Sequence, residues 1–244
     1  PYTPAPNDPA GYRIVDGTMT YASGTTTQNN TLDVSLSSSD NQIIGIKIVM
    51  DGNISPASAT SFTFNTNGTT LPATDITNAR LWYTETDSNF AASSQFGATV
   101  VSPNGIFTIT GSQILTGWAT NYFWLTYDIP TGATPGNVVD AECTSLIVDG
   151  ISHTPTVTAP AGSRTIVAPT IFTVGASGNY FTIEAAYNAV PDPIINFYII
   201  EILSDYNDAL EILPVVFGPR ATAQYGITIR PAAGVIGTEL AGDP

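Results

Sequence analysis

Hydrophobic and polar residues alternate with a period of two in a series of short segments between about residues 20 and 160. In such a segment one side faces a core and the other side faces solvent. Turn signals such as Asp51-Gly52 and Asp149-Gly150 separate the segments. The clearest segments are 43–50, 61–65, 79–84, 105–110, 122–130 and 138–148. Because helical periodicity is nearly absent here, the pattern predicts an antiparallel β-sandwich.

The segment 121–130, NYFWLTYDIP, is the richest in aromatic residues. Both of its sides are apolar, with Tyr122 and Trp124 on one side and Phe123 and Leu125 on the other. A strand that is apolar on both sides is typical of the middle of a sheet. We therefore expect Phe123 or Trp124 to be buried. The alternative interpretation is an exposed aromatic platform that binds a ligand.

The pattern changes after residue 167. Apolar residues at positions 183, 186, 187 and 190 have helical spacing, and they predict a short helix over 181–190. Thr182 is the expected N-cap and Pro191 the expected stop. Strand-like segments follow at 197–203 and 225–230.

These patterns predict an all-β chain in three parts. Residues 1–20 read as an extended arm or linker because prolines interrupt them and no apolar periodicity is present. Residues 21–167 form the predicted β-sandwich. Residues 168–244 form a smaller β-rich unit with one short helix, which we expect to be incomplete.

The amino-acid composition excludes several classes of function. The 244 residues include 6 basic and 20 acidic side chains, giving a net charge of −14. Such a chain lacks the basic surface that nucleic acids or anionic membranes require, and no apolar run reaches the roughly 18 residues of a membrane helix. Because the sequence begins at Pro1 without a signal peptide, we expect a processed chain or a piece of a longer one. Few lysines and abundant Thr, Ser, Asn and Gly favour an extracellular protein.

The sequence offers little for catalysis, and we expect no enzyme activity. His153 and Cys143 are the only residues of their types, and nothing in the sequence orients the histidine as a base. Cys143 lies in an alternating segment and is expected to be a buried thiol. Asp140 and Glu142 share one strand side, and Asp128 is expected on an adjoining strand, where calcium binding or turn solvation is favoured over acid–base chemistry.

Calcium is the one cofactor for which donors can be named. The candidates are oxygen-bearing side chains in or near turns, namely Asp51, Asn53, Asp128 and Asp140. None of them fits an EF-hand spacing, and the alternative is that these residues only stabilise turns. For glycan binding, the candidates are Trp82 and Trp118, provided that either lies on an exposed concave face.

Five stretches together resemble one known module. They are SFTFNTNGTT (61–70), DITNARLWYT (75–84), QFG (95–97), NYFWLTYD (121–128) and GNVVDAEC (136–143). In this order they resemble the domain at the N-terminus of BNR-repeat neuraminidases, which recurs in large secreted proteins of Bacteroidetes-type bacteria. The resemblance covers about 25–167 and implies a β-sandwich accessory domain of an exported surface protein. It does not imply sialidase activity, because the chain contains no Asp-box and no arginine cluster.

The C-terminal part resembles something else. TVGASGNYFTIEAAYNAV followed by ITIRPAAGV is similar to the opening of a right-handed parallel β-helix. A β-helix needs several stacked coils, so we expect further domains or neighbouring copies to abut this unit. The side chains expected to be uncovered in the isolated chain are Ile199, Ile202, Ile227 and Ile229.

Taken together, the sequence predicts a non-enzymatic structural or adhesion module of an exported bacterial surface protein, as part of a fibre or multi-domain adhesin. The alternative is a carbohydrate-binding accessory domain of a secreted glycosidase. In the first case the partners are other domains or copies of the chain, and in the second they are glycans.

Overall fold

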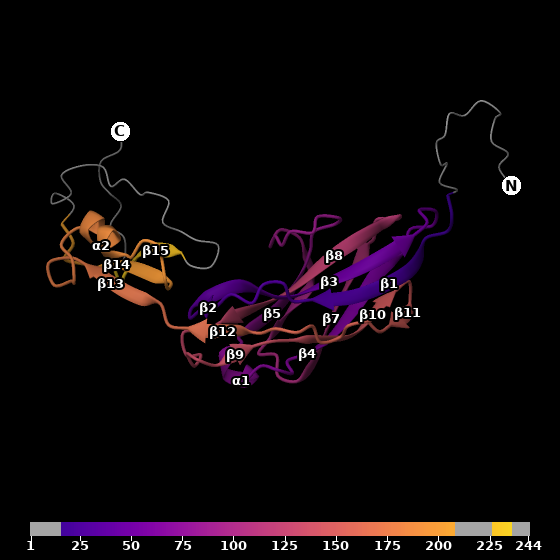
Figure 1. Ribbon diagram of the computed structural model, residues 1–244, viewed down its shortest axis with the longest axis horizontal. Coiled ribbons are helices and arrows are strands. Elements are labelled where there is room, and N and C mark those ends of the chain that lie inside the picture. Colours follow the sequence, from indigo (N-terminus) through magenta and orange to yellow (C-terminus); the bar gives the residue numbers. More distant parts are fainter. Residues whose placement is uncertain (1–15, 208–225, 236–244) are drawn as a thin grey trace, which may run out of the picture.

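The computed structural model describes residues 16–207 and 226–235, and two facing antiparallel sheets dominate it (Figure 1). The strands of the first sheet, in spatial order, are β1 Thr20–Thr27, β3 Ser38–Asp51, β8 Ala119–Ile129, β5 Asn78–Tyr83 and β6 Gln95–Val101. Those of the second are β11 Ile151–His153, β10 Glu142–Val148, β4 Ser58–Asn65 and β7 Ile106–Ile114. The prediction of an all-β sandwich is confirmed.

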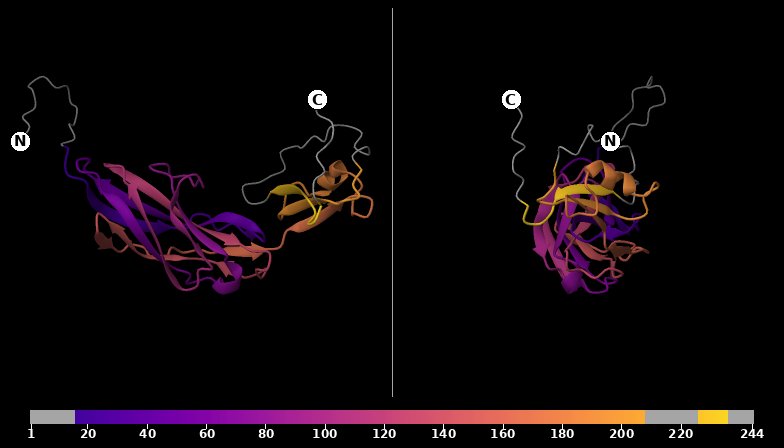
Figure 2. Two further views of the ribbon diagram at one scale, coloured as in Figure 1. Left: turned by 180° about the vertical axis from the view of Figure 1, so that it is seen from behind. Right: turned by 90° about the vertical axis from the view of Figure 1, so that its left-hand side faces the viewer.

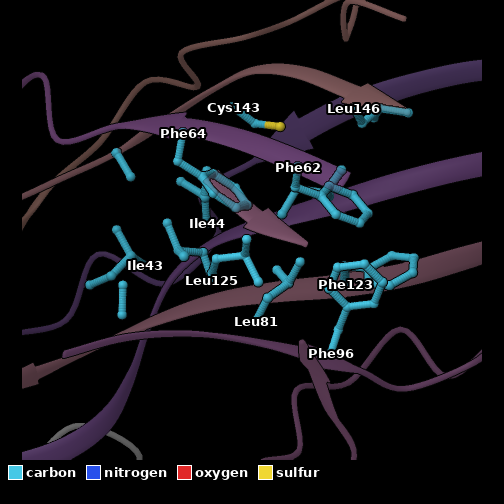
Figure 3. Close-up of a cluster of buried hydrophobic side chains, with 14 of the residues drawn as sticks. Ile43, Ile44, Phe62, Phe64, Leu81, Phe96, Phe123, Leu125, Cys143 and Leu146 are labelled. Atoms are coloured by element: carbon cyan, nitrogen blue, oxygen red, sulfur yellow. The ribbon is translucent and has the colours of Figure 1, made fainter. Parts of the chain in front are cut away.

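The core lies between these two sheets (Figure 3). Phe62 of β4 packs on Phe123 of β8, with ring centroids 4.7 Å apart, and meets Phe96 of β6 edge-on at 5.2 Å. Cys143 of β10 is fully buried in the same cluster, as expected. Burial raises the pKa of its thiol to about 12, so the thiol is inert at neutral pH.

Strand β8 is central, as its apolar sides predict. It pairs with β3 on one edge and with β5 on the other. Phe123 is completely buried and Trp124 is only 6% exposed, which confirms the expected burial. The two side chains nevertheless have different surroundings, because alternation places Phe123 in the core and Trp124 on the outer side of the sheet.

A small third sheet lies at one end of the sandwich. Its strands are β2 Val34–Ser35, β12 Arg164–Val167 and β9 Val138–Val139, and the one-turn helix α1 Pro72–Asp75 lies nearby (Figure 1). Arg164 fixes this end: its guanidinium donates to the backbone carbonyls of Leu32, Gln42 and Asp33 at 2.7, 2.7 and 3.2 Å. Burial lowers the pKa of Arg164 to about 10.

Beyond this end lies a parallel sheet with one helix against it (Figures 1 and 2). Its elements are β13 Thr170–Val174, β14 Tyr198–Ile202, β15 Ile227–Pro231 and α2 Ile183–Ala189. Thr170 pairs with Tyr198, 28 positions later, and Tyr198 pairs with Ile227, 29 positions later. Nearly constant spacing between parallel strands is typical of stacked coils.

The helix α2 is confirmed at its predicted place. Thr182 caps it by accepting a hydrogen bond from the Ala185 amide at 3.1 Å, and Pro191 follows its C-cap. Its buried residues Ala186 and Tyr187 pack with Val174 and Ile200 of the sheet. This small cluster forms the core of the C-terminal unit.

The four isoleucines expected to be uncovered differ from one another. Ile199 is buried, Ile202 and Ile227 are partly buried, and Ile229 of β15 is 37% exposed. Ile227 packs against the clusters around Ile200 and Tyr198, and Ile199 lies in the wall of a cleft between the sheet and the β2–β3 turn. The expectation of an uncovered apolar surface is therefore wrong for Ile199, and Ile229 is the most open of the four.

Several strands of the structure were not predicted from the sequence pattern. Strands β1, β6 and β12 carry polar or irregular sequences that gave no clear alternation. Of the predicted arm over 1–20, the first fifteen residues lie outside the described part, and Thr20 already belongs to β1.

Among the described residues, no helix is long and apolar enough to cross a membrane.

Candidate ligand-binding face

The outer side of the five-stranded sheet carries an aromatic and polar array. Alternation and register place side chains of three neighbouring strands together, because Trp82 pairs with Trp124, Arg80 with Thr126, and Lys47 with Tyr122. We call this surface the Trp82 face and define it by Asp40, Lys47, Arg80, Trp82, Tyr122, Trp124, Thr126 and Asp128.

The aromatic part has a buried centre and two accessible rings. Trp124 is held by Phe90, whose ring meets it edge-on at 6.2 Å, and by Tyr122, which is parallel to it at the same distance. The opposing residue is Gly45, where an added Cβ would lie 2.7 Å from the Trp124 ring. The rings of Trp82 and Tyr122 remain partly exposed on either side of Trp124.

Hydrogen bonds fix both indoles. The Trp82 Nε1–H donates to the Thr126 hydroxyl at 3.0 Å, and the Trp124 Nε1–H donates to the Thr84 hydroxyl at 2.8 Å. The Lys47 ammonium lies 6.0 Å from the centroid of the Tyr122 ring. These contacts hold the rings in defined orientations, and rigid aromatic side chains lose little entropy when a ligand packs on them.

The polar part is centred on Arg80. Its guanidinium donates to both carboxylate oxygens of Asp128 at 2.7 Å, and to Asp40 at 2.8 Å. Asp128 also accepts from the Asn78 side chain and from the Asp40 amide. Burial alone would raise the pKa of Asp128, but these donors, Arg80 above all, outweigh it and lower the pKa.

This network determines which polar groups stay available to a ligand. Asp128 keeps only 12% of its side chain exposed, whereas Arg80 and Asp40 keep 20% and 30%. Arg80 and Lys47 balance the two carboxylates of Asp40 and Asp128, so the ionised groups of the face sum to zero; among the described residues Lys47 makes no ion pair. Asp128 has no oxygen left for the calcium role considered from the sequence.

A cleft of about 280 Å³ lies beside the Trp82 face, under the loop between β5 and β6. Thr84, which holds the Trp124 indole, also lines this cleft. The other lining residues are mainly short or polar: Tyr83, Glu85, Asp87, Ala91, Ser93, Ser94 and Gln113. Side chains of this kind can bind hydroxyl groups by both donating and accepting.

The other glycan-binding and calcium-binding residues suggested by the sequence lie at separate places in the structure. Trp118 is 45% exposed in the turn before β8, away from the paired residues of the Trp82 face. Asp51 and Asn53 are exposed at the end of β3. Asp140 lies between β9 and β10. The four calcium candidates thus do not meet, and the described residues contain no group of three or more His, Cys, Asp or Glu placed to hold a metal.

The expectation that Asp128 lies on a strand adjoining that of Asp140 is wrong. Strand β8, which carries Asp128, belongs to the five-stranded sheet, whereas β10 belongs to the other one. Glu142 accepts a hydrogen bond from the Asn67 side chain instead. His153 lies in the short strand β11, where its ring stacks on Tyr21 at 3.7 Å, so it is a packed residue and not a loop histidine.

Sequence reasoning found Trp82 but missed most of its neighbours. Arg80, Asp40 and Tyr122 join the face because of strand register across positions that lie 40 or more apart in the chain. The one local signal was polar residues at every second position of β5, namely Asn78 and Arg80, followed by Trp82. That pattern marks the outer side of a strand and suggests a surface that can bind.

A second cleft, of about 380 Å³, lies between the sandwich end and the parallel sheet. Its walls include Leu36 and Arg164 from the sandwich, and Ile199 and Arg230 from the sheet. Arg164 uses its guanidinium on backbone carbonyls, and Arg230 pairs with Glu201 at 2.7 Å. Both charged groups are therefore already engaged within the chain.

Fold and surface together define the class: an all-β protein whose sandwich displays an ordered aromatic face. No family model matches the sequence, and no curated protein matches it. Among solved structures, Hadza microbial sialidase Hz136 is 16% identical, with a TM-score of 0.44 over 57% of this chain and 30% of its own. A family 123 glycoside hydrolase from Clostridium perfringens is 16% identical, with a TM-score of 0.27 over 71% of this chain and 32% of its own.

The chain therefore spans about a third of the length of each of these structural neighbours. Likenesses this weak identify neither a family nor an activity. The resemblance to the neuraminidase-associated domain, drawn from sequence motifs, stays an expectation.

Proposed function

We propose that this chain is a non-catalytic, exported module that binds carbohydrate through the Trp82 face. The observation that carries the proposal is the pair of partly exposed rings, Trp82 and Tyr122, beside fixed polar groups on one open sheet side. Sugars present apolar C–H faces that pack on aromatic rings, and hydroxyls that both donate and accept hydrogen bonds.

The charges of the face favour a neutral sugar. Arg80 is held by Asp40 and Asp128, and the remaining cation, Lys47, brings the four ionised groups of the face to a net charge of zero. The net charge of −14 would further repel acidic glycans. Neutral hexose-containing glycans are therefore the proposed ligand class.

The same network supports a binding role without catalysis. A glycosidase needs a carboxyl group that can give or take a proton near neutral pH. Asp128 has a lowered pKa because its oxygens are held by Arg80, which overcomes the opposite effect of burial. That carboxylate is suited to fixing Arg80 in place.

A glycan array tests the proposal with a matched pair of variants. The wild-type chain should bind neutral glycans, Trp82→Ala should weaken binding at least tenfold, and Trp118→Ala should leave it unchanged, because Trp118 lies in the turn before β8 and is not among the paired residues that define the face. Tyr122→Ala provides a second loss of ring surface. Absence of binding to any glycan, or binding that survives both Trp82→Ala and Tyr122→Ala, would contradict the proposal.

A second candidate function is structural, as part of a fibre or multi-domain adhesin. The spacing of 28 and 29 residues between β13, β14 and β15 favours it, together with Ile229, which is 37% exposed. In the described part of the chain no strand pairs with the outer edge of β15, and open edges accept further strands. Concentration-dependent assembly measured by light scattering, abolished by Ile229→Lys, supports this function; a monomer at all concentrations argues against self-assembly.

A further inference from the structure

The loop over 84–94, which joins β5 to β6, connects the Trp82 face to the cleft of about 280 Å³. At the start of the loop the Thr84 hydroxyl accepts the Trp124 indole N–H at 2.8 Å and donates to the Asp87 carbonyl at 2.7 Å. Further along, the Phe90 ring meets Trp124 edge-on at 6.2 Å. Most of the residues that line the cleft also belong to this loop, so the face and the cleft share one wall.

Backbone hydrogen bonds place the cleft at the Tyr122 end of the face. The Thr84 amide donates to the Tyr122 carbonyl at 3.1 Å, and the Tyr122 amide donates to the Glu85 carbonyl at 2.9 Å. Thr84 follows Trp82 by two residues, which is about 7 Å of extended chain. This distance is comparable with the step from one sugar ring to the next in a glycan. A glycan with one ring on the face can therefore place the next ring in the cleft.

The polar groups that line the cleft are available to a ligand. In the described part of the chain, the hydroxyls of Ser93 and Ser94 and the carboxylate of Glu85 make no hydrogen bond. Asp87 uses Oδ1 on the amide and side chain of Asn89, at 2.9 and 2.8 Å, and keeps Oδ2. Sugar hydroxyls both donate and accept, so they match this combination of hydroxyls and carboxylates.

The charge of the cleft differs from that of the face. Glu85 and Asp87 line it, no basic residue does, and no ion pair between described residues includes either carboxylate. Lys47 lies on β3, which is on the opposite side of β8 from β5. A carboxylate or sulfate on a ligand would meet two like charges in the cleft, which is unfavourable.

We propose that this cleft is a second sugar subsite, which takes the ring next to the one on the Trp82 face and selects a neutral hexose over an acidic sugar. The proposal rests on the proposed binding of carbohydrate by the Trp82 face. Ser93, Ser94 and Gln113 supply hydrogen-bonding groups, while Glu85 and Asp87 accept from hydroxyls and repel acidic substituents. Two adjoining subsites imply that the ligand is an oligosaccharide and not a single sugar.

The test uses the smallest neutral glycan that the wild-type chain binds on the array, in three forms. They are the unextended glycan, the glycan extended by one neutral hexose, and the glycan extended by the corresponding hexuronic acid, with every linkage of the extension presented. In at least one linkage the hexose form should bind about tenfold more tightly than the unextended glycan, a gain typical of one or two added hydrogen bonds. The hexuronic form should bind no more tightly than the unextended glycan.

Two substitutions in β7 block the cleft or spare it. Gln113 lines the cleft, so Gln113→Trp should abolish the gain from the added hexose and leave binding of the unextended glycan unchanged. Ser112→Trp is the matched control, because Ser112 is exposed next to it and does not line the cleft, and this variant should keep the gain.

A second pair of variants tests the selection by charge. Glu85→Gln should raise binding of the hexuronic form towards that of the hexose form, because it removes one of the two like charges. Asp51→Asn removes an exposed carboxylate outside the cleft and should leave the hexuronic form as weak as in wild type. Because Glu85 is exposed, Glu85→Gln keeps the test decisive if Gln113→Trp fails to fold.

The outcomes distinguish failure of the subsite from failure of the proposed function. A gain that is absent in wild type, that survives Gln113→Trp or that disappears in Ser112→Trp would overturn the subsite, while binding of the unextended glycan would still support the Trp82 face. A hexuronic form that binds wild type as tightly as the hexose form would overturn the selection by charge. Absence of binding to any glycan would overturn both proposals.

Discussion

Truncation of neighbouring aromatic residues in β8 should destabilise the fold by very different amounts, depending on which side of the sheet each residue occupies. Phe123 is fully buried between the sheets and contacts the rings of Phe62, Tyr83 and Phe96 at centroid distances of 4.7, 4.7 and 5.7 Å. Phe123→Ala would leave a cavity among these rings, because close-packed surroundings relax only partly. The expected loss is about 3–5 kcal/mol of unfolding free energy.

Tyr122 is the matched control, one position away on the same strand. Its ring is partly exposed on the outer side, so Tyr122→Ala should cost less than about 1.5 kcal/mol. The difference between the variants comes from alternation alone, since both remove an aromatic ring from a central strand.

Urea denaturation followed by tryptophan fluorescence measures this difference. The chain has three tryptophans, Trp82, Trp118 and Trp124, and all lie in the sandwich, so the signal reports its unfolding and not that of the C-terminal unit. With a slope of about 2 kcal/mol per molar urea, Phe123→Ala should lower the midpoint by about 1.5–2.5 M. Equal midpoints for the two variants would refute the assignment of Phe123 to the core and Tyr122 to the outer side.

Three further predictions follow from buried and charged groups. Arg164→Ala should cost about 3–5 kcal/mol in the same urea assay, because a buried guanidinium is removed and three backbone carbonyls lose a charged donor; a loss below 1 kcal/mol would contradict this. Cys143 should not react with a thiol reagent at pH 8 until the chain unfolds, since burial raises its pKa to about 12; rapid native-state labelling would argue against its burial. The pKa of Asp128 is lowered in the fold, so its contribution to stability is present above the ordinary pKa of 3.8 and is lost as the pH falls through the folded value. Asp128→Asn should therefore flatten acid unfolding followed by circular dichroism, and an unchanged acid profile would count against the Arg80 pairing.

Alternation predicted the central strands well because their buried sides are apolar. It missed β1, whose sequence TYASGTTT is mostly small and polar, because this strand is specified by pairing with β3 and not by its own periodicity. The prediction that Asp128 and Asp140 lie on adjoining strands was wrong for a related reason. Each residue lies near a strand, but a strand pattern does not say which sheet the strand joins.

The candidate face was predictable only in part. Trp82 stood out as a single aromatic residue, whereas its grouping with Arg80, Asp40 and Tyr122 depends on the registers of β3, β5 and β8.

The most direct test of carbohydrate binding by the Trp82 face uses the three indole N–H signals in a ¹H–¹⁵N correlation spectrum. Titration with the neutral glycan that binds best on the array should shift the Trp82 indole signal, because this ring is partly exposed and its N–H is bonded to Thr126 at 3.0 Å. The Trp118 signal should stay in place. A titration that shifts Trp118 and leaves Trp82 unmoved, or that shifts none of the three, would contradict the account.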